Sequence, residues 1–587
     1  MLADEMKVMV AVHRRTEKTM KPMLLSLALL SVGGLALPQP VQHRGIWMHA
    51  TSAKTPAQAD EILDRIQRAH LNAIYCLVFY WGGRAYYNSD MVARAQDIAP
   101  DFDPLQYLVQ GAHARGIEFH AWFVNGENGS SEPGTVFAQH PDWMIVARNG
   151  QRQYWYDFGK PEVREFQRNV MLEVLRKYEV DGIHFDYIRY PSTDYCYCDY
   201  CRGEFQRKYG PLPTEVLGET FPLVARFSAN PLARPTTAQT LAEFDHGVPA
   251  ITLNALGAGA CLLLNWHAEE TRVPALDTVL RRALTQFGAK ADNLYVYNPP
   301  TNRQRYSDGF LNTGFDWLKA LGFSPQRLPQ GKTLGDLKPT DILVLTCVYL
   351  MAPEEAAAME AFIRSGGHLI FIDGPVLAMQ QEALQRVTGM AQAGAYFSEE
   401  HLISAVGTSE LIPTGGGQAD LARYRQALGK WSAFQKEGIT ALVRDVYQRG
   451  KQLKPAAQIS AAVFYNRAAA DSVAQNWYAW LDQGIVDYVI PMAYVMRDED
   501  LSAALNEWRR ADPTLERIIP GLSIYLREDG AVSRPPELVL RQTRLCLDAG
   551  ARGTCFFAVN YLDDTLIEAL AGGAYAELAQ PYRPPPR

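Results

Sequence analysis

The residues best suited to chemistry belong to a short stretch, V-D-G-I-H-F-D-Y-I-R-Y-P, at positions 180–191. If this stretch is a strand, its side chains alternate between two faces, so His184 and Asp186 share one face. A carboxyl group there can donate or accept a proton. Burial would favour its protonated form, whereas pairing with Arg189 would favour the ionised form of a base or nucleophile. The alternatives are a structural carboxylate satisfied by a neighbouring loop and a histidine that fills the core.

The surrounding elements must bring this stretch to an edge that a substrate can reach. A helix is expected at 160–178, because Pro161 and Glu162 suit its first turn. Three further strands are expected before Asp186, at 44–50, 72–81 and 117–124. Four are expected after an interruption, at 458–465, 486–494, 518–525 and 553–561. Eight strands alternating with helices predict an α/β fold, the closed (β/α)8 TIM barrel, whose catalytic groups stand at the carboxyl ends of the strands.

The interruption predicts a second domain, inserted after the fourth strand. Several prolines after Tyr209 mark the break, and strands are expected at 260–266, 294–297, 341–346 and 368–373. Helices at 275–287 and 353–365 between them favour an open parallel sheet. The predicted parts are a signal peptide with N-terminal extension at 1–40, the first barrel half at 41–212, the insert at 213–427, the second barrel half at 428–575 and a disordered tail at 576–587.

Composition supports a globular protein of two or more domains. The chain has 587 residues, of which 48% are hydrophobic and 21% charged, with a net charge of −7. No long basic run stands out, so nucleic acid is not expected as a partner. Aromatic residues make up 11% of the chain. Their faces suit sugar rings, although a large core would also use them.

The first forty residues have the pattern of an export signal. Lys18 and Lys21 precede an apolar run at 23–36, which ends in small residues and resembles a secretory signal peptide cleaved after Ala36. The run is short for a membrane span, and no other candidate is found. We therefore expect a secreted or periplasmic protein without a stable membrane anchor.

Three of the eight cysteines cluster directly after the fourth strand, as Cys196, Cys198 and Cys201. Their C-x-C-x-x-C spacing suits a structural zinc site, which would need a fourth ligand. One disulfide and a free thiol is the alternative in an exported protein. No other cofactor is expected.

Several motifs together resemble the bacterial glycoside-hydrolase-like family 10. They are D-F-D-P-L at 101–105, A-H-A-R-G-I-E-F-H-A-W-F at 112–123, H-P-D-W at 140–143, G-K-P-E-V-R at 159–164, V-D-G-I-H-F-D at 180–186, K-W-S-A-F-Q-K-E at 430–437 and V-D-Y-V-I-P-M-A-Y at 486–494. The resemblance covers about 44–210 and 425–570. It implies a barrel that acts on a polysaccharide, or descends from enzymes that do, and it makes Asp186 the leading catalytic candidate. Where the family commonly has two acids in succession, this chain has Asp186 and then Tyr187, as in a neighbouring glycosidase-like group.

The insert resembles the glutamine-amidotransferase-like sheet attached to some bacterial glycosidases. An active amidotransferase needs a cysteine on a tight elbow, and Cys347 in L-T-C-V-Y-L has no adjacent glycine to permit that turn. A structural or homo-oligomerisation module is therefore the preferred interpretation of the insert.

Hydrolysis of a glycosidic bond usually requires two carboxyl groups, so a partner for Asp186 is needed. Glu127, which follows the third strand closely, is preferred; Asp90, Asp157 and Asp563 are weaker candidates. The seventh strand ends in Tyr525, with Glu528 three residues further on. A substrate-assisted reaction would need only one acid. Residues expected to bind the carbohydrate lie at or near strand ends. They are Trp47, His49, Tyr80, Trp122, Asn125, His184, Arg189, Tyr465, Tyr494, Tyr525 and Asn560.

Three hypotheses follow. The first is an exported glycoside hydrolase. The second is a non-catalytic carbohydrate-binding barrel that has lost one carboxylate. In the third, the insert is the functional part, as a sensor or assembly domain. Substrate, linkage and stereochemical outcome are not readable from the sequence.

Overall fold

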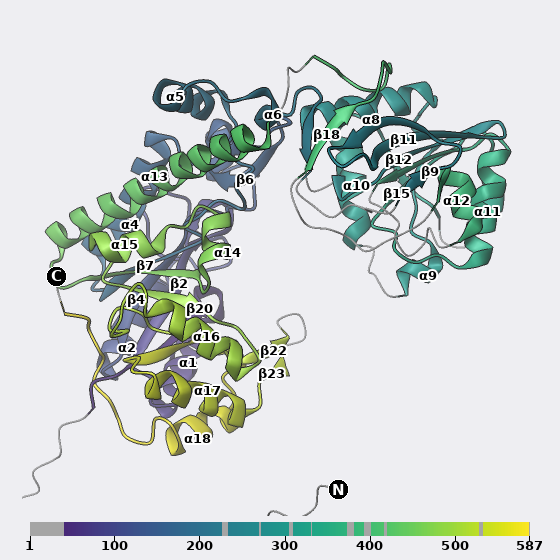
Figure 1. Cartoon of the computed structure of the whole chain (residues 1–587). Helices are drawn as coiled ribbons and strands as arrows, with labels where there is room; N and C mark the ends of the chain where they lie inside the picture. The colour runs from purple at the N-terminus through teal and green to yellow at the C-terminus, as the bar shows by residue number, and fades with distance from the viewer. Residues whose placement is uncertain are drawn as a thin grey trace, which may run out of the picture. The chain divides into compact units, whose positions relative to one another are not determined.

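The protein folds around a closed barrel of eight parallel strands (Figure 1). The computed structural model describes residues 40–225, 233–268, 272–304, 309–329, 332–372, 381–391, 401–415, 420–527 and 532–585. In barrel order the strands are β1 (His43–His49), β2 (Ala73–Tyr80), β4 (Glu118–Val124), β7 (Gly182–Asp186), β19 (Gln458–Phe464), β20 (Tyr488–Met492), β21 (Gly521–Ser523) and β24 (Gly553–Phe557). Pairing of β1 with both β2 and β24 closes the ring. The predicted TIM barrel is therefore confirmed, with four strands on each side of the insert.

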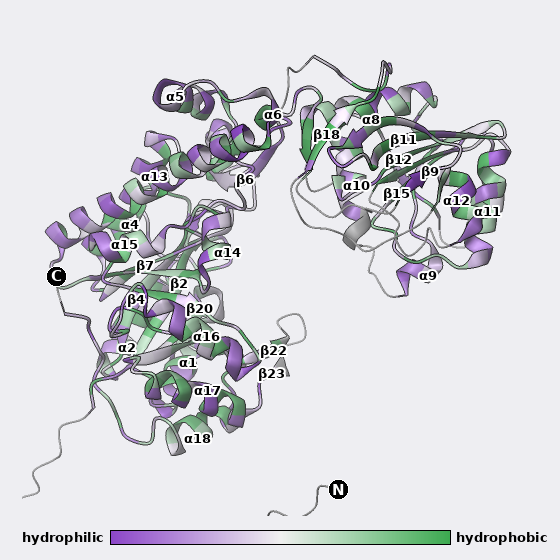
Figure 2. Ribbon diagram, in the orientation of Figure 1, coloured by the Kyte–Doolittle hydropathy of each residue, from purple (hydrophilic) through white to green (hydrophobic). Residues whose placement is uncertain are grey.

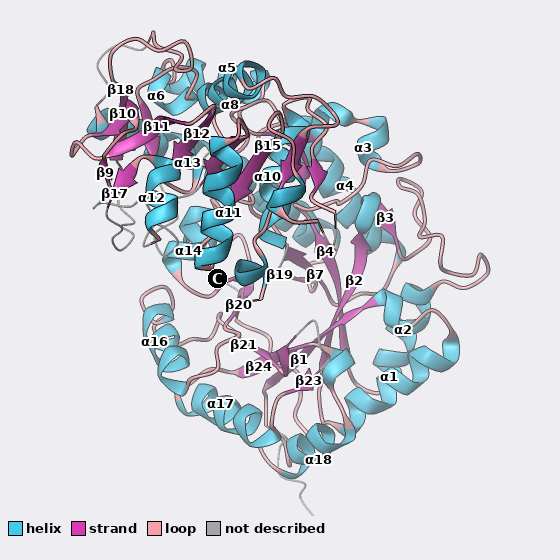
Figure 3. Cartoon of the chain, turned by 90° about the vertical axis from the view of Figure 1, so that its right-hand side faces the viewer, coloured by secondary structure: helices cyan, strands magenta, loops and turns pink. Residues whose placement is uncertain are grey.

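Helices cover the outside of this barrel (Figure 3). Those that follow the first strands begin at a proline and are capped locally: Thr55 and Asp103 accept hydrogen bonds from the backbone N–H groups of Gln58 and Gln106. The principal barrel helices are α1 (Pro56–Arg68), α2 (Pro104–Ala114), α4 (Pro161–Lys177), α13 (Leu421–Leu453), α15 (Trp477–Gln483), α16 (Asp498–Trp508), α17 (Pro536–Asp548) and α18 (Asp564–Gly572). The strands are predominantly hydrophobic and the helices two-sided (Figure 2), as burial between two layers requires.

The barrel interior holds large aromatic residues and a polar layer near the amino ends of the strands. The hydroxyl groups of Tyr75 and Tyr488 lie 2.7 Å apart, and the Tyr75 hydroxyl lies 3.0 Å from Nε2 of His43. Gly182 makes room for His120, whose ring stacks on Tyr75: a Cβ at Gly182 would lie 2.5 Å from Nδ1 of His120 and 2.3 Å from the Gln458 carbonyl oxygen. These side chains therefore fill the barrel interior below the carboxyl-end rim.

The insert contains a mixed sheet rather than the open parallel sheet expected from the sequence. Its strand order is β14 (Gln326–Arg327), β13 (Leu294–Val296), β15 (Ile342–Thr346), β16 (His368–Ile372), β12 (Gly259–Leu264), β11 (Pro249–Leu256), β10 (Gln239–Phe244), β18 (His401–Ala405) and β8 (Leu223–Ala225). The first five strands are parallel and the rest pair antiparallel. The change occurs between β11 and β12. Only Gly257 and Ala258 connect these strands, and so short a turn permits only an antiparallel pair.

The turn at Cys347 also differs from expectation. Cys347 follows β15 directly and has a φ of +53°, so the strained turn forms without an adjacent glycine. Its side chain is buried, with 5% exposure. A buried thiol offers little access to a substrate, and the structural or oligomerisation role of the insert stays a prediction.

The expectations for the two ends of the chain have different outcomes. Residues 1–39, which carry the expected signal peptide, lie outside the described residues. The C-terminal residues up to 585, expected to be disordered, are instead held against the barrel. Arg583 forms ion pairs with Glu118 at 2.6 Å and Asp181 at 3.1 Å, and the Gln580 carbonyl accepts a hydrogen bond from Gln42 N. Among the described residues, no helix combines the length and apolarity needed to cross a membrane.

Candidate active site

Asp186 is the last residue of β7, at the carboxyl-end rim of the barrel. Its side chain is buried, with 6% exposure, and each oxygen accepts one hydrogen bond. The indole N–H of Trp122 donates to Oδ2 at 3.1 Å, and the backbone N–H of Tyr187 donates to Oδ1 at 2.7 Å. Tyr187 has a φ of +49°, so the chain turns sharply away from the strand at this point. The result is a carboxyl group fixed at the mouth of the barrel.

Burial determines the protonation state of this carboxyl group. It raises the pKa of Asp186 to about 6, against the opposing effects of Arg189, the Tyr187 N–H and the Trp122 indole. No neighbouring carboxylate contributes to this rise in pKa. At mildly acidic pH Asp186 therefore carries a proton that it can deliver, which is the state required of a general acid.

Arg189 lies over aromatic rings close to this acid. Its guanidinium carbon is 4.4 Å from the ring centroid of Tyr187, 4.8 Å from that of Phe464 and 5.5 Å from that of Trp155. Burial lowers the pKa of Arg189, whereas Asp186, Tyr187 and Glu127 raise it. Its Nε atom is buried without a hydrogen-bond partner, and no ion pair to Arg189 is found within the described ranges. Arg189 thus supplies a partly desolvated positive charge at the rim.

Glu127 follows β4, and its negative charge raises the pKa of Arg189. It is half-buried and forms a β-bridge with Trp155, whose indole N–H donates to the Arg189 carbonyl at 2.8 Å. Gly126 permits this close packing, because a Cβ there would lie 2.4 Å from the Trp155 ring and from the Tyr187 carbonyl oxygen. Glu127 raises the pKa of Tyr187, so its charge reaches the Asp186 loop. The structure therefore brings the two preferred acids to neighbouring loops.

Two predicted substrate ligands instead form part of the barrel interior. Trp47 is 1% exposed and donates its indole N–H to Nε2 of His184 at 3.1 Å. That bond makes Nε2 an acceptor, so Nδ1 carries the proton and donates to Oγ of Ser460 at 2.9 Å. Burial lowers the pKa of His184 well below its ordinary value, so the ring is neutral. Contact of either residue with a sugar is contradicted by this burial; alternation could not distinguish the mouth of the barrel from its interior.

Asn125 and Trp122 are buried as well. Asn125 donates from Nδ2 to Oε1 of Gln167 at 2.9 Å, on the helix-facing side of the barrel wall, and is fully buried. Trp122 is 3% exposed and holds Asp186. Asn125 was predicted to bind sugar, but its burial makes it a structural residue. Trp122, also predicted to bind sugar, instead donates a hydrogen bond that holds Asp186.

The remaining predicted ligands include a half-buried aromatic group. Tyr494 and Tyr525 pack edge to face at 6.2 Å between centroids, and both contact Phe557, at 5.7 and 6.1 Å. His49 packs edge-on against Trp122 at 5.3 Å. Phe557 was missed because the strand was expected to continue to residue 561, whereas β24 ends at Phe557 itself. Half-burial leaves part of these rings open to a ligand.

Three predicted ligands lie outside this group. Tyr80 is half-buried and packs against Trp81, while Tyr465, also half-buried, accepts the indole N–H of Trp508 through its carbonyl. Asn560 is exposed and accepts a hydrogen bond from Ser52 at 3.2 Å. Their contact with a carbohydrate stays a prediction.

The weaker acid candidates have other contacts. Asp90 pairs with Lys177 at 3.0 Å, and Asp563 caps α18 by accepting from Leu566 N. Asp157 lies among the three clustered cysteines. Glu528 lies outside the described residues. Glu127 is left as the preferred second carboxyl group.

Comparison of the sequence with known proteins finds a family model and several relatives. The family model described as glycosyl hydrolase-like 10 matches residues 42–216 and 396–525. The glycosyl hydrolase DigH of Escherichia coli (strain K12) is 30% identical over 216 residues, which cover 33% of this chain and 48% of DigH. The glycosyl hydrolase YngK of Bacillus subtilis (strain 168) is 31% identical over 145 residues, covering 22% of this chain and 28% of YngK. The chain thus spans at most about half the length of these relatives.

Among solved structures, the glycoside hydrolase domain of PgaB (BpsB) from Bordetella bronchiseptica aligns with 90% of this chain and 98% of its own. The TM-score is 0.41 and the sequence identity 10%. A beta-galactosidase from Bacillus circulans sp. alkalophilus aligns with 89% of this chain and 50% of its own, with a TM-score of 0.41 and 11% identity.

Proposed function

We propose that this chain, which belongs to the glycosyl hydrolase-like 10 family, hydrolyses O-glycosidic bonds of a polysaccharide or oligosaccharide with Asp186 as its general acid. The observation that carries the proposal is the buried carboxyl group at the carboxyl end of β7, with a pKa of about 6. Glycosidases need such an acid to protonate the leaving oxygen.

The surroundings of Asp186 suit both stages of a proton transfer. Below about pH 6, burial keeps the carboxyl group protonated before transfer. After transfer, the carboxylate is held by the N–H groups of Trp122 and Tyr187 and by the positive charge of Arg189. These groups are already in place, so little rearrangement accompanies the formation of the charge.

Glu127 is proposed as the second carboxyl group, which activates water or attacks the sugar. Its support is its place on the neighbouring loop and its electrostatic effect on Arg189 and Tyr187. The half-buried rings of Tyr494, Tyr525 and Phe557 are proposed to stack on the sugar.

A second candidate function is a carbohydrate-binding barrel without hydrolytic activity. One observation favours it: burial alone accounts for the raised pKa of Asp186, with no contribution from a second carboxylate. A substrate-assisted reaction, with one protein acid, fits the same observation.

We also propose that the protein is exported, with the apolar run at 23–36 as its signal, and that the insert serves as a structural or homo-oligomerisation module. Both follow from sequence patterns.

The test is sugar release from a panel of bacterial and plant polysaccharides by the wild-type protein, Asp186→Asn and the matched control Asp90→Asn. Asp186→Asn is expected to lose about 10²- to 10⁴-fold in rate, because a general acid contributes that much. Asp90→Asn changes an exposed carboxylate paired with Lys177 and should keep its activity. Equal release by all three proteins would overturn the assignment. Glycan binding by the wild type without release would favour the binding barrel.

A further inference from the structure

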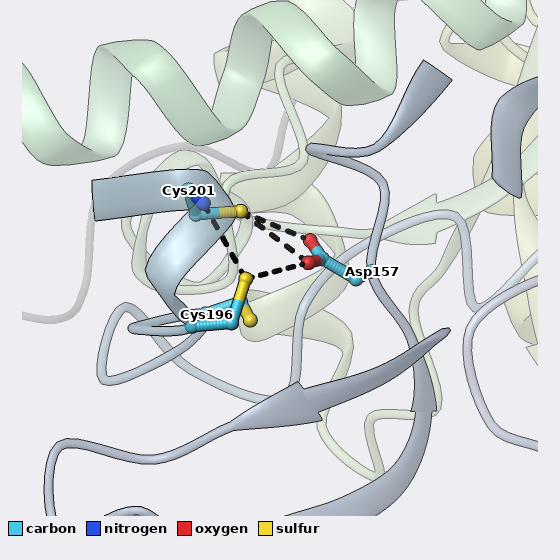
Figure 4. Close-up of side chains that lie close together, drawn as sticks. Asp157, Cys196 and Cys201 are labelled. Atoms are coloured by element: carbon cyan, nitrogen blue, oxygen red, sulfur yellow. Dashed lines mark hydrogen bonds between the residues drawn. The ribbon is translucent and has the colours of Figure 1, made fainter. Parts of the chain in front are cut away.

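A second cluster of chemically active side chains lies beside the Asp186 loop. Cys196 and Cys198 come from the loop after β7, Cys201 from the first turn of α5 (Asp199–Tyr209), and Asp157 from the loop after β6 (Arg152–Tyr156). Figure 4 shows Asp157, Cys196 and Cys201 pointing toward one another. One ligand atom from each of the four residues lies within 4.8 Å of all the others.

The carboxylate of this cluster, Asp157, lies among thiols. Asp157 is fully buried, and Cys196 and Cys201 are each 1% exposed. Within the described ranges Asp157 forms no ion pair, and its partners include the thiols of Cys198 and Cys201. A buried carboxylate is costly unless a positive charge compensates it. The sequence suggested three ligands and lacked the fourth; Asp157 supplies it, from 39 residues upstream of Cys196.

The spacing of the donors fits a tetrahedral zinc ion. With bond lengths of about 2.3 Å to sulfur and 2.0 Å to oxygen, a tetrahedral zinc ion places its sulfur and oxygen ligands about 3.5 Å apart. The thiol sulfurs of Cys198 and Cys201 lie 3.3–3.4 Å from the Asp157 oxygens. Gly159 leaves the room, since a Cβ there would lie 2.5 Å from Sγ of Cys201. Cys198 also lines a surface cavity of about 320 Å³, which gives the metal a route in.

We propose that Asp157, Cys196, Cys198 and Cys201 bind one structural zinc ion, which ties the loop region between β4 and α4 (Asp157) to the loop after β7 (the cysteines). Four protein ligands leave no open coordination position, so the site is of the closed, structural kind. The alternative from the sequence, a disulfide with a free thiol, does not use Asp157.

The metal site is connected to the segment that follows Asp186. The hydroxyl group of Tyr190 donates to Oδ1 of Asp157 at 3.3 Å and accepts from Gly159 N at 3.0 Å. Tyr190 is 1% exposed and stands next to Arg189. The zinc thus helps to fix the turn that carries Tyr187 and Arg189. This consequence, unlike the binding itself, rests on the proposed function.

The test measures metal in protein purified under reducing conditions. By mass spectrometry of the elements, wild-type protein is expected to contain about one zinc per chain. Cys198→Ser and Asp157→Ala should contain much less, whereas the control Cys546→Ala, which alters a buried thiol in α17, should retain it. If the first two variants fold poorly, titration of metal-free, reduced wild-type protein with Co²⁺ replaces them. One equivalent should then give the intense absorption of cobalt–thiolate bonds.

Three outcomes would overturn the zinc site: no metal bound by the reduced wild type, equal metal in all variants, or a disulfide between two of the three cysteines by peptide mapping. Metal removal by a chelator should also lower any hydrolytic rate, and added Zn²⁺ should restore it. An unchanged rate would overturn the connection to the Asp186 turn. Failure of the proposed function looks different, because the wild type would then bind zinc and release no sugar.

Discussion

The two halves of the barrel rim carry different chemistry. In the first half, β4 is followed by Glu127, and β7 ends in Asp186 with Arg189 close behind. In the second half, the four residues after each of β19, β20, β21 and β24 include no carboxylate. Aromatic residues stand there instead: Tyr465, Tyr494, Tyr525 and Tyr561. The chain before the insert therefore supplies the carboxyl groups, and the chain after it supplies ring faces.

This difference separates two physical tasks. A proton donor must be desolvated and held by fixed N–H groups, as Trp122 and Tyr187 hold Asp186. Sugar binding needs apolar faces that stay partly open, as Tyr494 and Tyr525 do. Variants in the first half should therefore affect the rate of the chemical step, and variants in the second half should affect binding.

The largest effect is expected from Glu127→Gln. Loss of a catalytic carboxylate should lower kcat by about 10²- to 10⁴-fold while glycan binding persists. Glu132→Gln, an exposed change in the same loop, is the control, and both are measured by initial rates on the best substrate of the panel. An unchanged kcat in Glu127→Gln would leave Asp186 as the one acid of the first half and favour a substrate-assisted reaction.

A smaller effect is expected on stability. The pKa of Asp186 is raised by burial from 3.8 to about 6, so the buried carboxylate costs stability above about pH 6 and the cost disappears as pH falls toward 4. Asp186→Asn should remove a penalty of up to about 3 kcal/mol near pH 8, less about 1 kcal/mol for one lost hydrogen bond. Urea unfolding near pH 8 and pH 4 measures this. A gain that is equal at both pH values, or shared by Asp90→Asn, would contradict a buried charge.

The smallest effect is expected in the second half. Tyr525→Ala should raise KM roughly fivefold, the equivalent of about 1 kcal/mol of ring contact, and leave kcat within about twofold. Leu526→Ala is the control, because Leu526 is 40% exposed on the same short strand, β22 (Tyr525–Arg527). A fall in kcat with unchanged KM would mean that the second half takes part in the chemical step.

The sequence was sufficient for features that local patterns encode. Apolar strands followed by helices predicted the eight-stranded barrel, and the acid at the end of V-D-G-I-H-F-D stood out because charged and aromatic residues follow it. The interior position of His184 was not readable, since alternation defines a face and not what covers it. Nor was Asp157 as the companion of the cysteines, or Arg583 as the partner of Glu118, because these pairs form only when distant segments pack together.

The central claim is that Asp186 is a general acid kept protonated by burial, and the pH dependence of kcat/KM tests it most directly. We expect the wild-type value to fall as pH rises through about 6, the pKa of Asp186 in the free protein. In Arg189→Met this fall should move to higher pH, because the lost guanidinium no longer lowers that pKa. A rate independent of pH between about 5 and 8, or a fall at the same pH in both proteins, would contradict the claim.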